Sequence, residues 1–128
     1  MMYDGGRTMN EKKFEILYDY KKTLTCIIND VVTQVDVYQI RALKDFNGIR
    51  QGELGGYIES EYNLSHEGNC WIYDEGKVFG QAKICDNVSV KGYAQVYGDG
   101  EIHGNICIKS FAKLYMNNST LNGDGEIK

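Results

Sequence analysis

His66 and His103 are the side chains of this 128-residue chain best suited to acid–base chemistry. A histidine exchanges protons near neutral pH, so either one could serve as a general base toward a hydroxyl or an amine. The sequence shows no nucleophile paired with a base, no phosphate-binding loop and no metal-ligand spacing around them. We therefore expect His103 to be a surface histidine without a catalytic role and His66 to be a hydrogen-bonding cap residue.

The four cysteines also lack the spacing that chemistry would need. They are Cys26, Cys70, Cys85 and Cys107, and no two of them form the CxxC pair of a zinc site. We expect four reduced thiols, with Cys70 buried as a small apolar side chain. The sequence thus predicts no catalytic residue, no bound metal and no other cofactor.

These side chains must be positioned by a fold with a six-residue repeat, because an aliphatic residue recurs at every sixth position. The series comprises Ile72, Val78, Ile84, Val90, Val96, Ile102, Ile108 and Leu114. A period of six fits neither an α-helix nor a plain strand, but it is typical of a solenoid. The first and fifth places of each hexad should face inward and the second and sixth outward. The third place is usually Gly or Asp, which tolerate the backbone of a corner: Asp74, Gly80, Asp86, Gly92, Gly98 and Gly104.

These hexads resemble the hexapeptide-repeat superfamily, whose fold is a left-handed parallel β-helix with coils of about 18 residues. The resemblance covers about half of the chain and implies an all-β protein with about three coils. The step from Leu114 to Leu121 is longer by one residue, so we expect a bulge or a loosened coil at Thr120. The absence of proline agrees, because proline would remove hydrogen bonds between coils.

A narrower resemblance covers about residues 35–128. The runs that carry it are DFNGIRQGELGGYIES and NLSHEGNCWIYD, together with the hexads behind them. They look like the uncharacterised YdcK-like hexapeptide proteins of bacteria and of phage or prophage genomes. This resemblance implies a β-helix with an N-terminal cap, but no established activity. Hexapeptide acyltransferases use a histidine between subunits as general base, and His103 could serve so, yet their long loop, C-terminal helix and coenzyme A clamp are not recognisable here.

The N-terminal part of the chain predicts a cap on this β-helix. Residues 1–13 are polar, and we expect them to be loosely ordered. The alternating runs FEIL, TLTCII and VDVYQIRAL predict an antiparallel β meander within residues 14–65, with turns at DYKK and NDVVTQ. The repeat domain then occupies residues 66–128.

Several residues around the junction of the cap and the repeat domain have a predicted role in joining the two. Gly52, Gly55 and Gly56 would allow the tight turns that lead from the flat sheet into the coils. Trp71 and Tyr57 are large enough to plug the open end of the coil stack.

Coils that stack every 18 residues or so place equivalent side chains above one another. The candidate partner-binding face consists of the column Phe79, Tyr97 and Tyr115 beside Lys77, Gln95 and Lys113. The column could stabilise its own sheet, form a protein interface or stack on nucleobases. A net charge of −4 argues against a nucleic acid partner. A second face should carry Lys83 and Cys85 below Glu101 and His103.

The last coil of a β-helix has unpaired backbone N–H and C=O groups, to which a strand of another chain can hydrogen-bond. We expect a second copy to pack there, giving a homodimer through Leu121, Asp124 and Ile127. Frayed terminal coils in a monomer are the alternative.

The sequence favours a small non-catalytic protein-binding module that docks through flat β-helix faces. The phage-like resemblance suggests a protein encoded by a phage or mobile element that inhibits a bacterial defence system, in the manner of an anti-CRISPR protein. No signal peptide or membrane-length apolar run is recognisable, so we expect it in the cytoplasm of the host bacterium, away from membranes. The alternatives are an acyltransferase, a nucleotide-binding sponge and a structural protein that assembles end to end.

Overall fold

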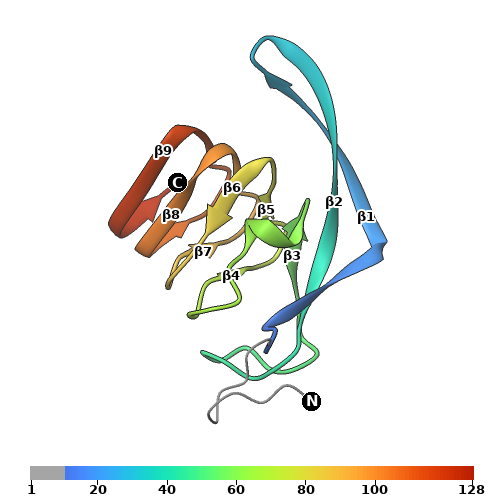
Figure 1. Ribbon diagram of the computed structural model, residues 1–128, viewed down its shortest axis with the longest axis vertical. Helices are drawn as coiled ribbons and strands as arrows, with labels where there is room; N and C mark the ends of the chain where they lie inside the picture. The colour runs from blue at the N-terminus through green and yellow to red at the C-terminus, as the bar shows by residue number, and fades with distance from the viewer. Residues whose placement is uncertain (1–10) are drawn as a thin grey trace.

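The computed structural model describes residues 11–128, and β-strands make up nearly all of its regular structure (Figure 1). One 3-10 turn, η1 (Glu61–Asn63), is the single helical element among these residues. The strands form a long hairpin and a parallel β-solenoid of about 4 turns, which confirms the predicted all-β architecture. No helix in the described part of the chain is long and apolar enough to cross a membrane.

The hairpin consists of β1 (Phe14–Ile28) and β2 (Val31–Ala42), which pair antiparallel along their whole length. Asn29 and Asp30 form its turn with φ angles of 52° and 64°, a conformation that these two residue types tolerate and that two-residue hairpin turns require. The predicted turn at DYKK is wrong, because these residues lie inside β1, where the pairing register shifts between Leu17 and Lys21.

The strand β3 (Leu54–Ile58) belongs to both parts of the fold. One edge of β3 pairs antiparallel with β2, so the N-terminal sheet has three strands, but not the three predicted: FEIL and TLTCII both belong to β1, and β3 was not predicted. The other edge pairs in parallel with β5 (Lys77–Val78), so that Tyr57 lies opposite Lys77 and the first coil starts there. This first coil accounts for the turn beyond the three that the hexads predict.

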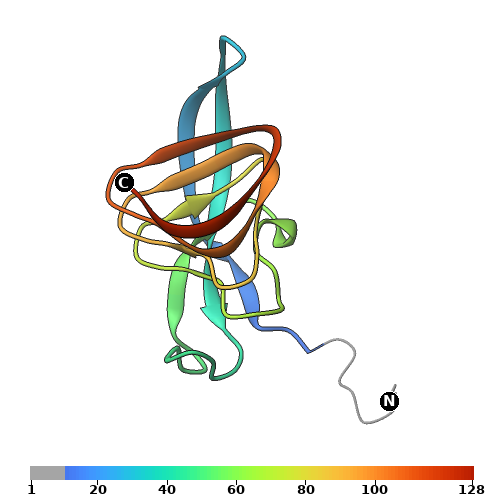
Figure 2. The same cartoon turned by 90° about the vertical axis from the view of Figure 1, so that its left-hand side faces the viewer.

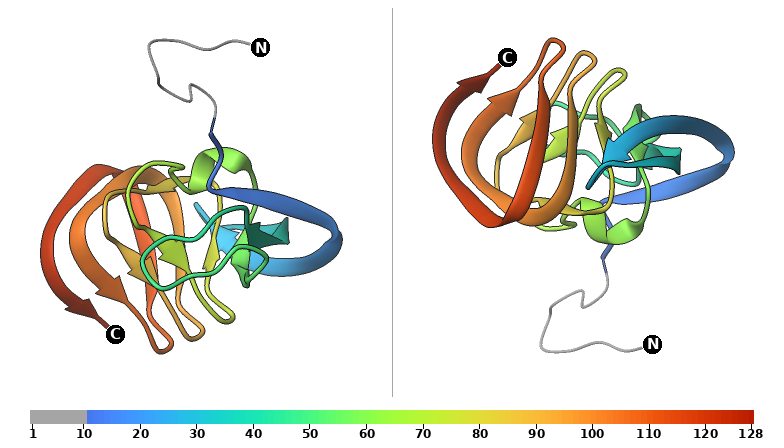
Figure 3. Two further views of the ribbon diagram at one scale, coloured as in Figure 1. Left: turned by 90° about the horizontal axis from the view of Figure 1, so that it is seen from below. Right: turned by 90° about the horizontal axis from the view of Figure 1, so that it is seen from above.

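The remaining strands follow the coils of the solenoid. They are β4 (Trp71–Ile72), β6 (Gln81–Ile84), β7 (Ser89–Val90), β8 (Gln95–Ile108) and β9 (Lys113–Ile127). Neighbouring coils pair in parallel and in register, as Trp71 with Ser89 and Ser89 with Cys107 show. Figure 3 shows the coils stacked side by side, with β9 at the end farthest from the hairpin.

The corners of the coils confirm the third-place prediction. All six predicted corner residues have positive φ angles, between 55° and 101°: Asp74, Gly80, Asp86, Gly92, Gly98 and Gly104. The extra residue of β9 relative to β8 is Asn118, which has a φ of 50° and lies where the register of the pairing shifts. Thr120 pairs normally with Glu101, so the predicted bulge exists but lies two residues earlier than expected.

The interior of the solenoid is built from the aliphatic series. Seven of its members have no exposed surface, and Leu114 in the last coil is half-buried. Trp71 is buried in the same core with its ring edge-on to Phe46 of the cap, at a centroid distance of 5.3 Å, which agrees with its predicted role as a plug. Tyr57 does not share this role, because it lies in a separate cluster beneath the hairpin.

The glycines of β3 are required by close packing rather than by turns. A Cβ atom on Gly56 would lie 2.5 Å from the Gly76 carbonyl oxygen, and one on Gly55 would lie 2.7 Å from the Trp71 ring. The prediction of tight turns is therefore wrong for these two glycines. It holds for Gly52, whose φ of 91° favours glycine.

Candidate functional site

Phe79, Tyr97 and Tyr115 form the column that the repeat predicts. The rings of Phe79 and Tyr97 stack with centroids 4.9 Å apart and planes 4° from parallel. The rings of Tyr97 and Tyr115 lie 5.4 Å apart and are tilted by 57°. The column follows from the parallel register, in which Tyr97 of β8 lies opposite Tyr115 of β9.

The hairpin covers the base of this column. Phe79 has no exposed surface because Val35 and Val37 of β2 pack in the same cluster, and Lys77, whose Nζ lies over the Tyr57 ring, is 8% exposed. The prediction that these two residues face solvent is wrong, since the hexad pattern describes the solenoid and not the hairpin that lies on it. Tyr97 is half-buried and Tyr115 is 44% exposed, so the open part of the column is its C-terminal end.

Lysine side chains fix the hairpin to the solenoid. Lys22 of β1 is bonded to Glu75, and its Nζ lies 4.5 Å from the centre of the Tyr57 ring. Lys77 of β5 donates to the Glu75 carbonyl oxygen at 2.8 Å, and its Nζ lies 5.4 Å from the centre of the same Tyr57 ring. The Glu75 carboxylate raises the pKa of Lys22, whereas burial lowers the pKa of Lys77.

A groove runs between β1 and the open part of the aromatic face. We call it the hairpin groove; it has a volume of about 370 Å³ and is lined by Leu24, Thr25, Cys26, Ile27, Gln95, Tyr97 and Lys113. Three of the six predicted partner-binding residues therefore line it. No carboxylate and no histidine occurs among these lining residues.

The hairpin tip next to the groove is apolar and exposed. Ile27, Val31 and Val32 are 67%, 60% and 69% exposed. Figure 2 shows the hairpin extending well beyond the coils, so these side chains lie on a projecting arm. The two valines belong to the run NDVVTQ, for which a turn was predicted; that prediction is wrong for them, and their β-branched side chains favour the strand in which they lie.

A second exposed aromatic pair lies at a corner of the solenoid. Tyr93 and Phe111 stack with centroids 5.1 Å apart and planes 3° from parallel, and they are 56% and 77% exposed. These two residues were not predicted, because they occupy the fourth hexad place, to which the hexad pattern assigned no direction. Their spacing is the same as that of Tyr97 and Tyr115, and this was the signal that could have found them.

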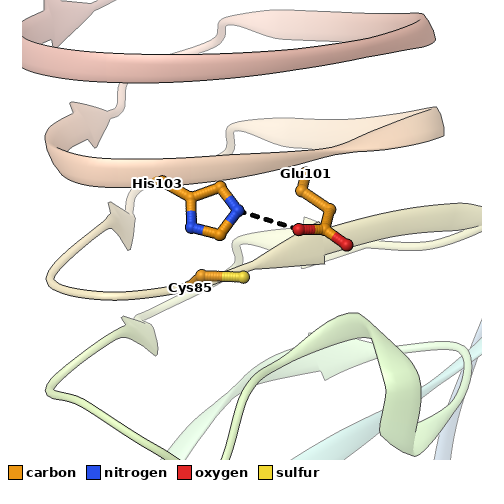
Figure 4. Close-up of side chains that lie close together, drawn as sticks. All are labelled: Cys85, Glu101 and His103. Carbon is orange, nitrogen blue, oxygen red and sulfur yellow. Dashed lines mark hydrogen bonds and ion pairs between the residues drawn. The ribbon is translucent and has the colours of Figure 1, made fainter.

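The second face brings Cys85, Glu101 and His103 together, as the coil spacing predicts (Figure 4). One ligand atom from each side chain lies within 4.8 Å of the others. His103 Nε2 lies 2.8 Å from Glu101 Oε1, and His103 Nδ1 lies 3.5 Å from Asp86 Oδ2. His103 thus lies outward and partly exposed as predicted, but it is held by two carboxylates.

Cys85 is the most buried member of this cluster. Its exposed fraction is 7%, and burial raises the pKa of its thiol to about 11, with the nearby Glu101 and Asp86 acting in the same direction. All four cysteines are free, as predicted. The prediction that Cys85 faces solvent is wrong, because the neighbouring coil covers it.

His66 has the cap role that the sequence predicts. Its Nδ1 accepts a hydrogen bond from the backbone N–H of Lys13 at 3.0 Å, and its Nε2 lies 2.7 Å from Glu61 Oε2. The His66 ring stacks on Phe14 at a centroid distance of 4.2 Å. These contacts tie the start of β1 to the first coil.

Lys13 is a fully buried lysine that sequence analysis missed. Its Nζ donates to the Cys70 carbonyl oxygen at 2.6 Å and lies 5.0 Å from the centre of the Phe46 ring. Burial lowers the pKa of Lys13 and raises the pKa of Cys70, which is buried as predicted. The expected loose order of residues 1–13 is wrong for Lys13, whereas residues 1–10 lie outside the described part of the chain.

The residues expected to form a homodimer lie in β9. Leu121 and Ile127 are half-buried against the solenoid core, and Asp124 is exposed and accepts a hydrogen bond from Asn105 Nδ2 at 2.9 Å. Within residues 11–128, β9 pairs with β8 alone, so its other edge carries no strand (Figure 3). The contact with a second copy stays a prediction.

Comparison with known proteins gives one short similarity. No protein-family model matches the chain. A stretch of 55 residues is 47% identical to the uncharacterized acetyltransferase YdcK of Escherichia coli (strain K12). It covers 42% of this chain and 17% of the E. coli protein, so the similarity concerns a small part of that relative. The similarity agrees with a hexapeptide-repeat solenoid, which the structure shows independently.

Proposed function

We propose that this protein is a non-catalytic binding module whose partner is another protein and whose binding surface is the hairpin groove. The observation that carries the proposal is the groove itself, which is bounded by an exposed apolar hairpin tip on one side and by Tyr97 and Lys113 on the other. Exposed aliphatic residues next to a partly buried tyrosine are the composition of a protein interface core.

The polar groups of the groove suit recognition of a protein better than catalysis. Gln95 offers an amide and Lys113 a cation at the edge of the aromatic column, where they can orient a partner. Acid–base catalysis needs a group that exchanges protons near neutral pH, and the lining residues include neither a histidine nor a carboxylate. A nucleic acid would need several cations, whereas the lining set has one and the chain has a net charge of −4.

The biological role that we propose for this binding module is inhibition of a bacterial defence system. A rigid, acidic solenoid that binds through one face acts by occupying a surface rather than by turnover. We place such a protein in a phage or mobile element, where it inhibits a bacterial defence system in the host cytoplasm as anti-CRISPR proteins do. Expression in a defended host should then raise the plating efficiency of a targeted phage, and unchanged plating efficiency against each defence tested counts against this form.

Binding at the groove can be tested by comparing two double variants, one in each aromatic pair of this chain. The double variant Tyr97→Ser/Tyr115→Ser removes the open end of the column, whereas Tyr93→Ser/Phe111→Ser removes the corner pair. An affinity-tagged wild-type protein should retain a stoichiometric partner that the first variant loses and the second keeps. Equal retention by all three proteins would contradict the proposal, provided that circular dichroism shows both variants folded.

A second candidate function is acyl transfer, which one observation favours. His103 Nε2 lies 2.8 Å from Glu101 Oε1, so a carboxylate holds an imidazole that could remove a proton from an acceptor hydroxyl or amine. The name of the E. coli relative points the same way. Acetyl-coenzyme A should then raise the melting temperature, and His103→Ala should abolish acetyl transfer. Absence of a thermal shift would end this candidate.

A further inference from the structure

Three different kinds of metal ligand converge on the second face of the solenoid. Cys85 directly follows β6 in one coil, and Glu101 and His103 come from β8 in the next (Figure 4). Sulfur, imidazole and carboxylate together form a donor set that suits zinc and related divalent transition metals. We propose that these three residues bind one such ion and thereby cross-link two coils.

The distances are close to those of a tetrahedral site. Zinc bonds of about 2.0–2.3 Å place neighbouring ligand atoms about 3.3–3.6 Å apart. The Nε2 of His103 and the Oε1 of Glu101 are 2.8 Å apart, and the ligand atoms of all three residues lie within 4.8 Å of one another. Rotations of these side chains that move each donor by about 1 Å therefore suffice to complete the site.

The second nitrogen of His103 lies near a carboxylate, as it does in many metal sites. Its Nδ1 is 3.5 Å from Asp86 Oδ2, so a small rotation of the ring would let an Nδ1–H donate to that carboxylate while Nε2 binds the ion. Asp86 is itself held in place, because its Oδ2 accepts the Gly104 backbone N–H at 2.9 Å. Metal-binding histidines generally have such a carboxylate partner.

The Cys85 thiol supplies an independent observation. It is more than nine-tenths buried and directed toward Glu101 and His103, yet its Sγ has no hydrogen-bond partner among the residues that the structure describes. Cys70, the other buried cysteine, is different, because its Sγ contacts the Lys13 ammonium at 3.3 Å and backbone carbonyls. A metal ion would satisfy the Cys85 sulfur.

The negative charges around Cys85 suit a metal-binding thiolate better than a catalytic one. A nucleophilic cysteine must be a thiolate, but the Glu101 carboxylate lies beside the Cys85 sulfur and disfavours a second negative charge there. A divalent cation reverses this effect, because it attracts both the thiolate and the carboxylate. The side chains of His103 and Glu101 remain partly exposed, which leaves room for water as a fourth ligand.

Cobalt titration tests the site without any assay of function. The chelator-treated full chain should bind one Co²⁺ with a thiolate-to-metal absorption band, and Zn²⁺ should displace it. Cys85→Ser should abolish the band, and His103→Gln and Glu101→Gln should each weaken binding at least about tenfold. Cys107→Ser is the matched control, since it removes a half-buried thiol outside the cluster, and it should leave the spectrum unchanged.

Two results would overturn the proposal. One is the absence of a thiolate band in the wild-type protein, which needs no variant to fold. The other is full affinity in folded Cys85→Ser, which would place the ion elsewhere.

Discussion

The Phe79 ring lies parallel to the Tyr97 ring at a centroid distance of 4.9 Å, although Phe79 is fully buried and Tyr97 retains an exposed surface. The aromatic column therefore has two parts. Its base is a packing element between the hairpin and the solenoid, whereas Tyr97 lines the hairpin groove and Tyr115 stands next to Tyr97. Substitutions along one column should accordingly separate stability from binding.

Phe79→Ala should destabilise the fold strongly. The substitution leaves a cavity between β2 and the solenoid face, and we expect a loss of about 3–4 kcal/mol in the free energy of unfolding. Tyr115→Ala removes a ring that is 44% exposed and should cost about 1 kcal/mol or less. Urea unfolding measures both, and equal losses would show that the hairpin does not cover the column in solution.

Lys13→Ala should also destabilise the protein, although lysines on a surface usually contribute little. The change removes the buried ammonium that bonds the Cys70 carbonyl oxygen and leaves that oxygen unpaired, at a cost of about 2 kcal/mol. Lys12→Ala is the matched control, because its side chain is 55% exposed and its ion pair with Glu61 is worth about 0–1 kcal/mol. A neutral Lys13→Ala variant would contradict the burial of this lysine.

The raised pKa of Cys85 makes a pH-dependent contribution to stability in the metal-free protein. An unfolded chain releases this thiol proton near pH 9.0, whereas the folded chain holds it to a pKa of about 11. The folded state binds more protons between these values, so the contribution is complete below pH 9.0 and is lost as the pH rises to about 11. In the presence of a chelator, wild type should therefore lose stability relative to Cys85→Ala across this range. Parallel curves for the two proteins would argue against a buried thiol.

The free edge of β9 predicts self-association. Light scattering at micromolar concentration should return a homodimer, and Asp124→Arg should return a monomer, because the arginine adds bulk and charge at an exposed position of that edge. A wild-type protein that is monomeric at all concentrations would contradict the predicted homodimer.

The sequence predicted the solenoid well because its rhythm is local. Each aliphatic residue from Ile72 to Ile108 is inside, and the coil spacing correctly placed Tyr97 beside Tyr115. The hairpin over Phe79 was not predictable from that rhythm, because its contacts join residues far apart in the chain. Lys13 was missed for the same reason.

The cluster on the second face shows a different limit. The spacing put Cys85 and His103 on one face, yet the absence of a CxxC pair argued against a metal site. That rule describes ligands on tight turns, whereas a solenoid brings together residues from successive coils. In this fold the coil repeat is the better guide to ligand sets.

Site-specific photo-crosslinking in a bacterial host tests the central claim, that the hairpin groove binds a protein, most directly. A photoreactive residue at Thr25 or Tyr115 should capture one discrete protein of the host, since these positions face or adjoin the groove. The same residue at Phe111, which is 77% exposed at the corner, should capture none. No adduct from Thr25 and Tyr115, or the same adducts from all three positions, would contradict the account.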